Sequence, residues 1–571
     1  MNAKLSELIW SVADLLRGDY KQADYGKVIL PFTLLRRLDC VLTDTKSAVL
    51  KELTLRKGMA ETAREHLLVK AAGQTFYNTS KFDLPTLTGD PQHLKENLLS
   101  YLRSFSPNAR DVFDRYKFAE QIEYLDAKNL LFMVAEKFAT FDLHPKKVTN
   151  IAMGHAFEEL IRRFAELSNE TAGEHFTPRE VIHLMVNLLF LGDETGLQKS
   201  QVVRSIYDPT AGTGGMLSVA DDHLQAMNPG AKLVMYGQEL NDESYAICKA
   251  DMLIKGQEVT NIVAGNTLSE DGHAGRKFDY LISNPPFGVE WKKVQKEVTK
   301  EYEQQGYNGR FGPGLPRIND GALLFNLHLL SKMRPVSEGG SRMAIVHNGS
   351  PLFSGGAGSG ESEIRRYILE NDLLEAIVAL PTDMFYNTGI ATYIWILTNH
   401  KHPERNGKVQ LVNASGLWQK MKKSLGSKRK EMNPDQIEEV TRQYGAFEDG
   451  PLVKIFDTED FGYTAITVER PEWDVKGMIV KDKKGNPKPD SGLRDTENVP
   501  LKDDIQAYFE REVLPHAPDA WIDEKKSKVG YEIPFTRAFY EYQPPRPLEA
   551  IDADLKACVA RTQELLKEVV G

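Results

Sequence analysis

The stretch from Leu281 to Gly288 limits the possible folds of this chain more than any other. Its first two residues end a mainly apolar run, 278–282, that predicts a buried strand. Ser-Asn-Pro-Pro-Phe-Gly follows directly. Two consecutive prolines cannot continue a strand, and they restrict the residues before them to extended geometry. The strand therefore delivers an amide side chain, a fixed carbonyl and an aromatic ring at its carboxyl end, where open α/β sheets bind ligands.

These three groups suit methylation of an exocyclic amine on a base. The Asn284 side-chain oxygen and the Pro285 carbonyl could each accept one hydrogen of adenine N6, which would direct its lone pair toward a methyl donor. Phe287 can stack on a base turned out of the duplex. Transfer from a sulfonium depends mainly on positioning and electrostatics, so it needs neither an acid nor a metal. The alternative is a strand that ends in a proline turn with a capping Asn.

A glycine-rich turn lies upstream of this motif. A β-rich run, 202–207, leads into Asp-Pro-Thr-Ala-Gly-Thr-Gly-Gly at 208–215. Such glycines let backbone amides approach a ligand at a helix amino end. The turn is not a Walker loop, because Gly-Lys-Ser/Thr is absent from the chain, and it is not a dinucleotide fingerprint, because Leu217 takes the third glycine position. Alone, it fits a ligand site and a tight turn equally well.

Two further predicted strands end in polar residues. The strand 233–237 is followed by Glu239, which is placed to accept both hydroxyls of a ribose. The strand 262–264 is followed by Asn266, which could meet the edge of an adenine ring. Three successive strand ends therefore carry ligand-type residues ahead of the Asn-Pro-Pro-Phe strand, and this repetition is more informative than any single motif.

The remaining pattern predicts a doubly wound, mainly parallel α/β sheet between two helical parts. Strands at 343–347, 374–380, 393–398 and 409–412 follow a helix at 322–333, and the last strands predict a hairpin-like edge. Residues 1–148 show helical periodicity, and a helix at 151–165 precedes the loop 173–180. In that loop Thr177 predicts a helix cap, with Pro178 at the first helical position and Glu180 completing a capping box.

Charge and composition limit the partners. The 571 residues carry a net charge of −10, whereas phosphate binding needs clustered Lys and Arg. We therefore expect a local cationic face together with another polypeptide that makes most of the DNA contact. Six basic residues without an intervening acid, within 416–430, predict a solvated loop or a phosphate contact, and 475–530 predicts loops and short helices.

The cysteines and the apolar runs bear on the compartment. The three cysteines are far apart in sequence and lack metal-ligand spacing, which predicts a reduced cytoplasmic protein without zinc. The chain has no apolar run near the length of a membrane span.

Near the end of the chain, seven residues alternate spacings of three and four, and this seam favours a partner helix over packing on its own domain. They are Leu548, Ile551, Leu555, Cys558, Thr562, Leu565 and Val569.

Taken together, these motifs resemble the adenine-N6 DNA methyltransferases, specifically the modification subunits of type I restriction–modification enzymes. The likeness covers nearly the whole chain and includes the motif order. It implies a Rossmann-like S-adenosylmethionine-dependent methyltransferase domain with a helical N-terminal domain and a helical C-terminal tail. The implied catalytic residues are Asn284, Pro285, Pro286 and Phe287. The implied cofactor-binding residues are Glu174, His175, Phe176, Thr177, Pro178, Arg179, Asp208, Thr210, Gly212, Thr213, Gly214, Gly215, Glu239 and Asn266. His175 and Asn266 depart from the family, where an aromatic residue and an Asp are common.

The resemblance also implies an assembly. Two such chains would join one specificity subunit, which reads the DNA sequence and binds the C-terminal helix within 544–571, often with a restriction subunit added. The expected parts of this chain are a helical domain at 1–148, a catalytic domain at 149–415, a basic and polar extension at 416–543, and that helix. The catalytic motif does not separate adenine N6 from cytosine N4. A self-sufficient methyltransferase and a non-catalytic cofactor-binding scaffold are the alternatives.

Overall fold

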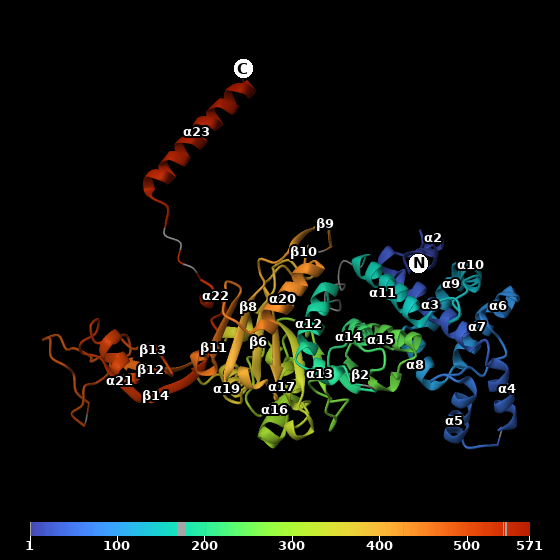
Figure 1. Ribbon diagram of the computed structural model, residues 1–571, viewed down its shortest axis with the longest axis horizontal. Helices are drawn as coiled ribbons and strands as arrows, with labels where there is room; N and C mark the ends of the chain where they lie inside the picture. Colours follow the sequence, from blue (N-terminus) through green and yellow to red (C-terminus); the bar gives the residue numbers. More distant parts are fainter. Residues whose placement is uncertain are drawn as a thin grey trace. The chain divides into compact units, whose positions relative to one another are not determined.

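The computed structural model describes residues 2–56, 58–167, 177–199, 201–386, 388–425, 427–482, 484–540, 542 and 545–570 (Figure 1). They divide into two compact units, Met1–Ile533 and Pro534–Gly571. The predicted four-part division at 148, 415 and 543 stays a prediction. No helix among the described residues is long and apolar enough to cross a membrane.

The first part of the chain is helical, as predicted. Helix α3 (Gly26–Leu42) lies at its centre, and Phe32 on it stacks on Phe138 and meets Phe118 edge-to-face. Helices α1 (Asn2–Trp10), α9 (Phe118–Ala127), α10 (Leu131–Ala139) and α11 (Asn150–Leu167) pack on it through apolar residues at helical spacing. The other helices of this part are α2 (Ala13–Leu16), α4 (Lys46–Leu55), α5 (Glu61–Ala72), α6 (Leu84–Thr88), α7 (Leu94–Arg103) and α8 (Pro107–Arg115).

A nine-stranded sheet follows, in the order β11-β8-β6-β7-β5-β4-β1-β2-β3. Strand β7 is antiparallel to both of its neighbours and β11 is antiparallel to β8, while the other pairs are parallel. The eight strands predicted from 202 to 412 are thereby confirmed. The strands are β1 (Val203–Asp208), β2 (Lys232–Glu239), β3 (Ile262–Ala264), β4 (Tyr280–Ser283), β5 (Arg342–Asn348), β6 (Leu374–Ala379), β7 (Thr392–Thr398), β8 (Lys408–Asn413) and β11 (Val453–Asp457).

The direction of winding reverses between β1 and β4. Helices α14 (Gly215–Met227) and α15 (Asp242–Lys255) connect β1 to β2 and β2 to β3, and these strands succeed one another toward the β3 edge of the sheet. Helix α17 (Ala322–Ser331) lies in the connection from β4 to β5, which runs toward the β11 edge. Right-handed crossovers therefore put α14 and α15 on one face and α17 on the other. Such a reversal opens a crevice at the carboxyl ends of the two central strands. Residues Asp208 and Asn284 stand at those two ends.

Two predictions for the C-terminal part of the first unit need correction. The basic run was expected to be a loop or a phosphate contact, and its strands β9 (Gln419–Leu425) and β10 (Lys428–Glu431) pair antiparallel. The range 475–530 contains a short helix, α21 (Ile505–Tyr508), as predicted, but also β13 (Asp495–Pro500) and most of β14 (Trp521–Tyr531), which flank β12 (Gly462–Glu469) in a three-stranded sheet. The core of this small sheet holds few apolar residues, so its strands lack the alternation that predicts a strand. That core consists of Ile466, Val468, Val499, Phe509 and Val513.

The second unit is small and mostly helical. It contains α22 (Phe535–Ala538) and α23 (Leu548–Val570), so the predicted terminal helix is present. The seam residues Leu548, Ile551, Leu555 and Leu565 keep 78%, 41%, 58% and 53% of their surface exposed. Within the described residues, α23 therefore does not bury its apolar face.

Candidate active site

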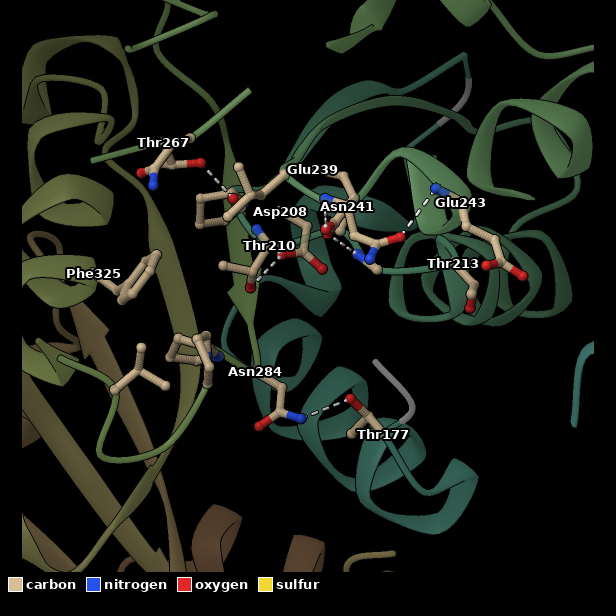
Figure 2. Close-up of a pocket in the computed structure, with 18 of the residues that line it drawn as sticks. Thr177, Asp208, Thr210, Thr213, Glu239, Asn241, Glu243, Thr267, Asn284 and Phe325 are labelled. Carbon is tan, nitrogen blue, oxygen red and sulfur yellow. Dashed lines mark hydrogen bonds between the residues drawn. The ribbon is translucent and has the colours of Figure 1, made fainter. Parts of the chain in front are cut away.

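A cavity of about 1380 Å³ opens at the carboxyl ends of β1 to β4 (Figure 2). Asp208, Glu239, Asn266 and Asn284 all line it, each from the end of a different strand or from the residues just after it. Typical small-molecule sites occupy about 300–1,000 Å³, so this cavity has room for two ligands. The polar strand ends identified in the sequence therefore meet at one place.

The glycine-rich turn shapes one wall of the cavity. Gly212 and Gly214 have φ angles of 53° and 81°, in the left-handed region that favours glycine. A Cβ on Gly214 would lie 2.8 Å from Cys248 Sγ, so only glycine fits against α15 there. Gly212 and Thr213 line the cavity, whereas Gly214 packs behind it.

Asp208 is the most buried carboxyl group in this wall, with 1% of its surface exposed. Its Oδ1 accepts a hydrogen bond from the Thr210 backbone N–H at 2.9 Å, and the Thr210 hydroxyl is 2.7 Å from Ser283 Oγ. Burial raises the pKa of Asp208 to about 7; the Thr210 N–H opposes this shift and the nearby Glu239 adds to it. A carboxyl group in this state favours a cationic ligand beside it.

Glu239 connects the ends of β1 and β2. Its Oε2 accepts from the Gly212 N–H at 2.8 Å and its Oε1 accepts from the Asn241 N–H at 2.7 Å. Each carboxylate oxygen retains a second lone pair for a ligand hydroxyl. On the next strand, Asn266 Oδ1 accepts from the Leu268 N–H at 3.0 Å, which fixes the turn after β3.

Arg310 holds that turn from outside the sheet. Its guanidinium donates to the carbonyls of Thr267 and Leu268 at 2.6 and 3.0 Å and pairs with Glu301 at 2.6 Å. Glu301 belongs to α16 (Gln295–Gln305), in the glycine- and lysine-containing segment after the Asn-Pro-Pro-Phe motif. The segment that follows the catalytic motif is therefore tied to the strand end where Asn266 lies.

Among the described residues, the Asn284 amide is hydrogen-bonded through its nitrogen only. Its Nδ2 donates to Thr177 Oγ1 at 3.0 Å (Figure 2). Its Oδ1 is buried and has no hydrogen-bond partner in the described part of the chain. An unpaired buried acceptor costs about 1–3 kcal/mol, so this oxygen is suited to a donor supplied by a ligand.

The bond to Asn284 corrects the predicted role of Thr177. Helix α12 (Arg179–Leu191) begins after Pro178, and the side chain at its cap position makes no capping bond. The predicted capping box at Thr177 and Glu180 is therefore wrong. Glu180 instead forms an ion pair with Lys428, and the Thr177 hydroxyl is turned toward the catalytic motif. The physical reason is that Asn284 offers this hydroxyl a donor across the cavity.

Three aromatic side chains line the same cavity as Asn284. Phe287 meets Phe385 edge-to-face, with ring centroids 5.6 Å apart and planes at 77°. Phe325 from α17 (Figure 2) also lines the cavity, as does Asn348 from the end of β5. The sequence prediction did not include Phe385, Phe325 or Asn348. Asn348 carried the same signal as the others, since it directly follows the predicted strand 343–347.

Not every predicted site residue reaches this cavity. Glu174, His175 and Phe176 lie outside the described residues. Arg179 lines a separate cavity beside His155 and His183, and Pro178 does not line the main one. The others that line it, besides those above, are Thr210, Gly215, Pro285 and Pro286. Their roles in binding and catalysis stay predictions.

The fold matches those of solved methyltransferase and modification subunits. It matches a methyltransferase subunit of a type I restriction–modification system from Streptococcus thermophilus with a TM-score of 0.63 and 23% identity, covering 80% of this chain and 96% of that one. A modification subunit of a putative type I restriction enzyme from Vibrio vulnificus matches with a TM-score of 0.52 and 16% identity, over 84% and 95%. The fold is thus that of the S-adenosylmethionine-dependent methyltransferases, as predicted.

Within that class, the chain belongs to the N-6 DNA methylase family, whose model matches residues 149–466. The model of the HsdM N-terminal domain matches residues 5–138. The methylase subunit of the type I restriction enzyme MjaIX from Methanocaldococcus jannaschii is 25% identical over 77% of this chain and 77% of its own length. The HindI methylase subunit from Haemophilus influenzae is 27% identical over 46% and 54%. The resemblance identified in the sequence is confirmed.

Proposed function

We propose that this chain is the modification subunit of a type I restriction–modification system and that it methylates N6 of an adenine turned out of duplex DNA. The observation that supports this most strongly is the Asn284 amide, whose buried Oδ1 lacks a partner while Thr177 holds its Nδ2. The N6 amine of adenine offers the hydrogen-bond donor that this oxygen lacks. The N6-specific family to which the chain belongs favours adenine over cytosine.

The residues of the cavity fit S-adenosylmethionine as the methyl donor. Asp208 would face its positive charge, the Glu239 carboxylate would accept from its ribose hydroxyls, and the turn at Gly212 and Thr213 admits a ligand close to the backbone. The residues near Asn266 would meet its adenine ring. When bound, this cofactor supplies an electrophilic methyl group.

The chain's own residues would then position the base. Asn284 Oδ1 and the Pro285 carbonyl accept the two N6 hydrogens, which draws the amine lone pair out of conjugation with the ring. Phe287, braced by Phe385, stacks on the extruded base and excludes water from it. Fixing this geometry in advance is the main catalytic contribution expected of these residues, because transfer from a sulfonium depends mainly on positioning and electrostatics.

Replacing Asn284 with Ala tests this role. In the assembled complex, we expect Asn284→Ala to lower the rate of adenine methylation by about 100-fold or more, because both the acceptor and the alignment of N6 are lost. The affinity for S-adenosylmethionine, measured by calorimetry, should stay within about twofold of the parent, since no cofactor contact is removed. Near-normal methylation by the variant would refute the proposal.

The same proposal includes an assembly with other subunits. The exposed apolar face of α23 matches a partner helix, and the net charge of −10 suits a chain that relies on another subunit for part of its DNA contact. A specificity subunit on α23, a second copy of this chain and, in the full system, a restriction subunit are the proposed partners. Duplex DNA is the proposed substrate.

A further inference from the structure

The helical N-terminal part of the chain forms one wall of the cavity. Residues from the corner between α8 and α9 line it: Arg115, Tyr116 and Lys117, followed by Glu120 and Gln121. They are brought there because α8 packs on α15, the helix that begins just after Glu239 and Asn241. The cavity is therefore completed by a region outside the matched methylase domain.

Contacts between α8 and α15 fix this wall in place. The Tyr245 hydroxyl donates to Asp111 Oδ2 at 3.0 Å, and Lys249 Nζ donates to the same oxygen at 2.8 Å. Arg115 pairs with Asp242 and its guanidinium lies over the Tyr245 ring. These contacts pair polar side chains of α8 with polar side chains of α15, so they explain the packing of the two helices without a ligand.

Tyr116 is different from its neighbours. It is buried, with 6% of its surface exposed, and it lines the cavity, yet its hydroxyl has no hydrogen-bond partner among the described residues. Removing a hydroxyl from water without a partner is costly. The next residue, Lys117, has a φ of 51°, a left-handed conformation that non-glycine residues rarely adopt. Strain of this kind is concentrated at ligand sites.

We propose that Tyr116 is a cofactor-binding residue whose hydroxyl bonds a polar group of S-adenosylmethionine. This inference rests on the proposed function. It makes the helical region part of the cofactor site, so that a bound cofactor bridges α8–α9 and the catalytic sheet.

The charges around the cavity favour this ligand over a DNA phosphate. Six carboxyl groups line it among the described residues, against four cations. Two of those cations are already paired, Arg115 with Asp242 and Lys27 with Asp24. A wall of this kind repels phosphate and attracts a molecule that carries a sulfonium and an ammonium group. The carboxyl groups are Glu120, Asp208, Glu239, Asp242, Glu243 and Glu290.

Tyr116 shares the cavity with the polar strand ends. Asp208, Glu239, Glu243 and Asn284 line it (Figure 2), and Tyr116 lines it where α8 packs against α15. Burial raises the pKa of Tyr116 well above its usual value, and the carboxylates of Glu243 and Asp251 add to the shift.

Calorimetric titration of the full-length chain with S-adenosylmethionine tests the inference. Tyr116→Phe removes only the unpaired hydroxyl, so we expect the ligand-free variant to melt no lower than the parent but to bind S-adenosylmethionine about tenfold more weakly. The matched control is Tyr245→Phe, which also removes one tyrosine hydroxyl at the α8–α15 contact, from a residue that does not line the cavity. Its affinity should stay within about twofold of the parent.

Each outcome has a distinct meaning. An unchanged affinity in Tyr116→Phe overturns the inference and leaves the proposed function standing. An equal loss in both variants also overturns it, because the effect would then come from helix packing. If the parent chain itself bound no S-adenosylmethionine, the proposed function would fail and the inference with it.

Discussion

The buried carboxyl group of Asp208 makes the stability of the folded chain depend on pH. Its pKa is raised by burial from an ordinary 3.8 to about 7 in the folded chain. The folded state therefore holds a proton that the unfolded state releases between these values. The stability that this group contributes is complete below about pH 4 and is lost as the pH rises through 7. A cationic ligand beside Asp208 relieves the cost of ionising it.

Replacing Asp208 with Asn should remove this dependence on pH. We expect Asp208→Asn to resemble the parent in unfolding free energy below about pH 4 and to exceed it at pH 8, by up to about 4 kcal/mol. Urea denaturation of both proteins across this range measures the difference. Parallel stability curves for the parent and the variant would contradict the assignment of the buried proton to Asp208.

Among elements, the hairpin β9–β10 supports the site from behind. Lys428 is only 3% exposed, pairs with Glu180 at the start of α12, and donates to the Met384 carbonyl at 3.1 Å. Met384 precedes Phe385, which packs on Phe287. The basic run at 416–430 was predicted as a loop or a phosphate contact, yet Lys428 is internal and connects β10 to the start of α12 and to the residue before Phe385.

Breaking this buried pair should be costly. Lys428→Met leaves the Glu180 carboxylate without its cation, so we expect a loss of about 3–5 kcal/mol in unfolding free energy. The double variant Glu180→Gln, Lys428→Met should recover most of it, and the exposed Lys422→Met on the same hairpin should cost under about 0.5 kcal/mol. Chemical denaturation gives all three values. If the double variant were no more stable than Lys428→Met, the pair would not be the cause.

The strands and their polar ends were predictable because their signals are local. A β-rich run followed by glycine or proline marks a strand end wherever it occurs, and parallel pairing brings such ends together. Thr177 was misread because a hydroxyl before a proline helix start looks like a cap, whereas Asn284 lies 107 positions away. Tyr116 was missed for the same reason: helix packing places it on the cavity, and no local pattern indicates that.

For the molecule as a whole, the proposed assembly helix α23 and the proposed catalytic cavity belong to different compact units. Helix α23 lies in its own compact unit, with its leucines exposed, while the cavity residues belong to the first unit. A change on the helix face should therefore affect partner binding and leave the cofactor site intact. The partner that this expectation concerns is the specificity subunit proposed above.

A substitution on the seam tests that separation. We expect Leu555→Lys to reduce co-purification of the specificity subunit at least tenfold, because a charge enters the apolar seam. Ala553→Lys, off the seam on the same exposed helix, should co-purify normally. Both variants should bind S-adenosylmethionine like the parent in calorimetry. Normal co-purification of Leu555→Lys would exclude this face as the contact.

The position of β7 has a consequence for how the chain is made. Strand β7 pairs with β5 and β6, both of which leave the ribosome before it. Until residues 392–398 emerge, β5 has an open edge in the middle of what becomes the largest sheet, and open edges recruit other chains. Completion of the sheet therefore waits for a late segment, although the cavity residues on β1 to β4 have all been synthesised by then.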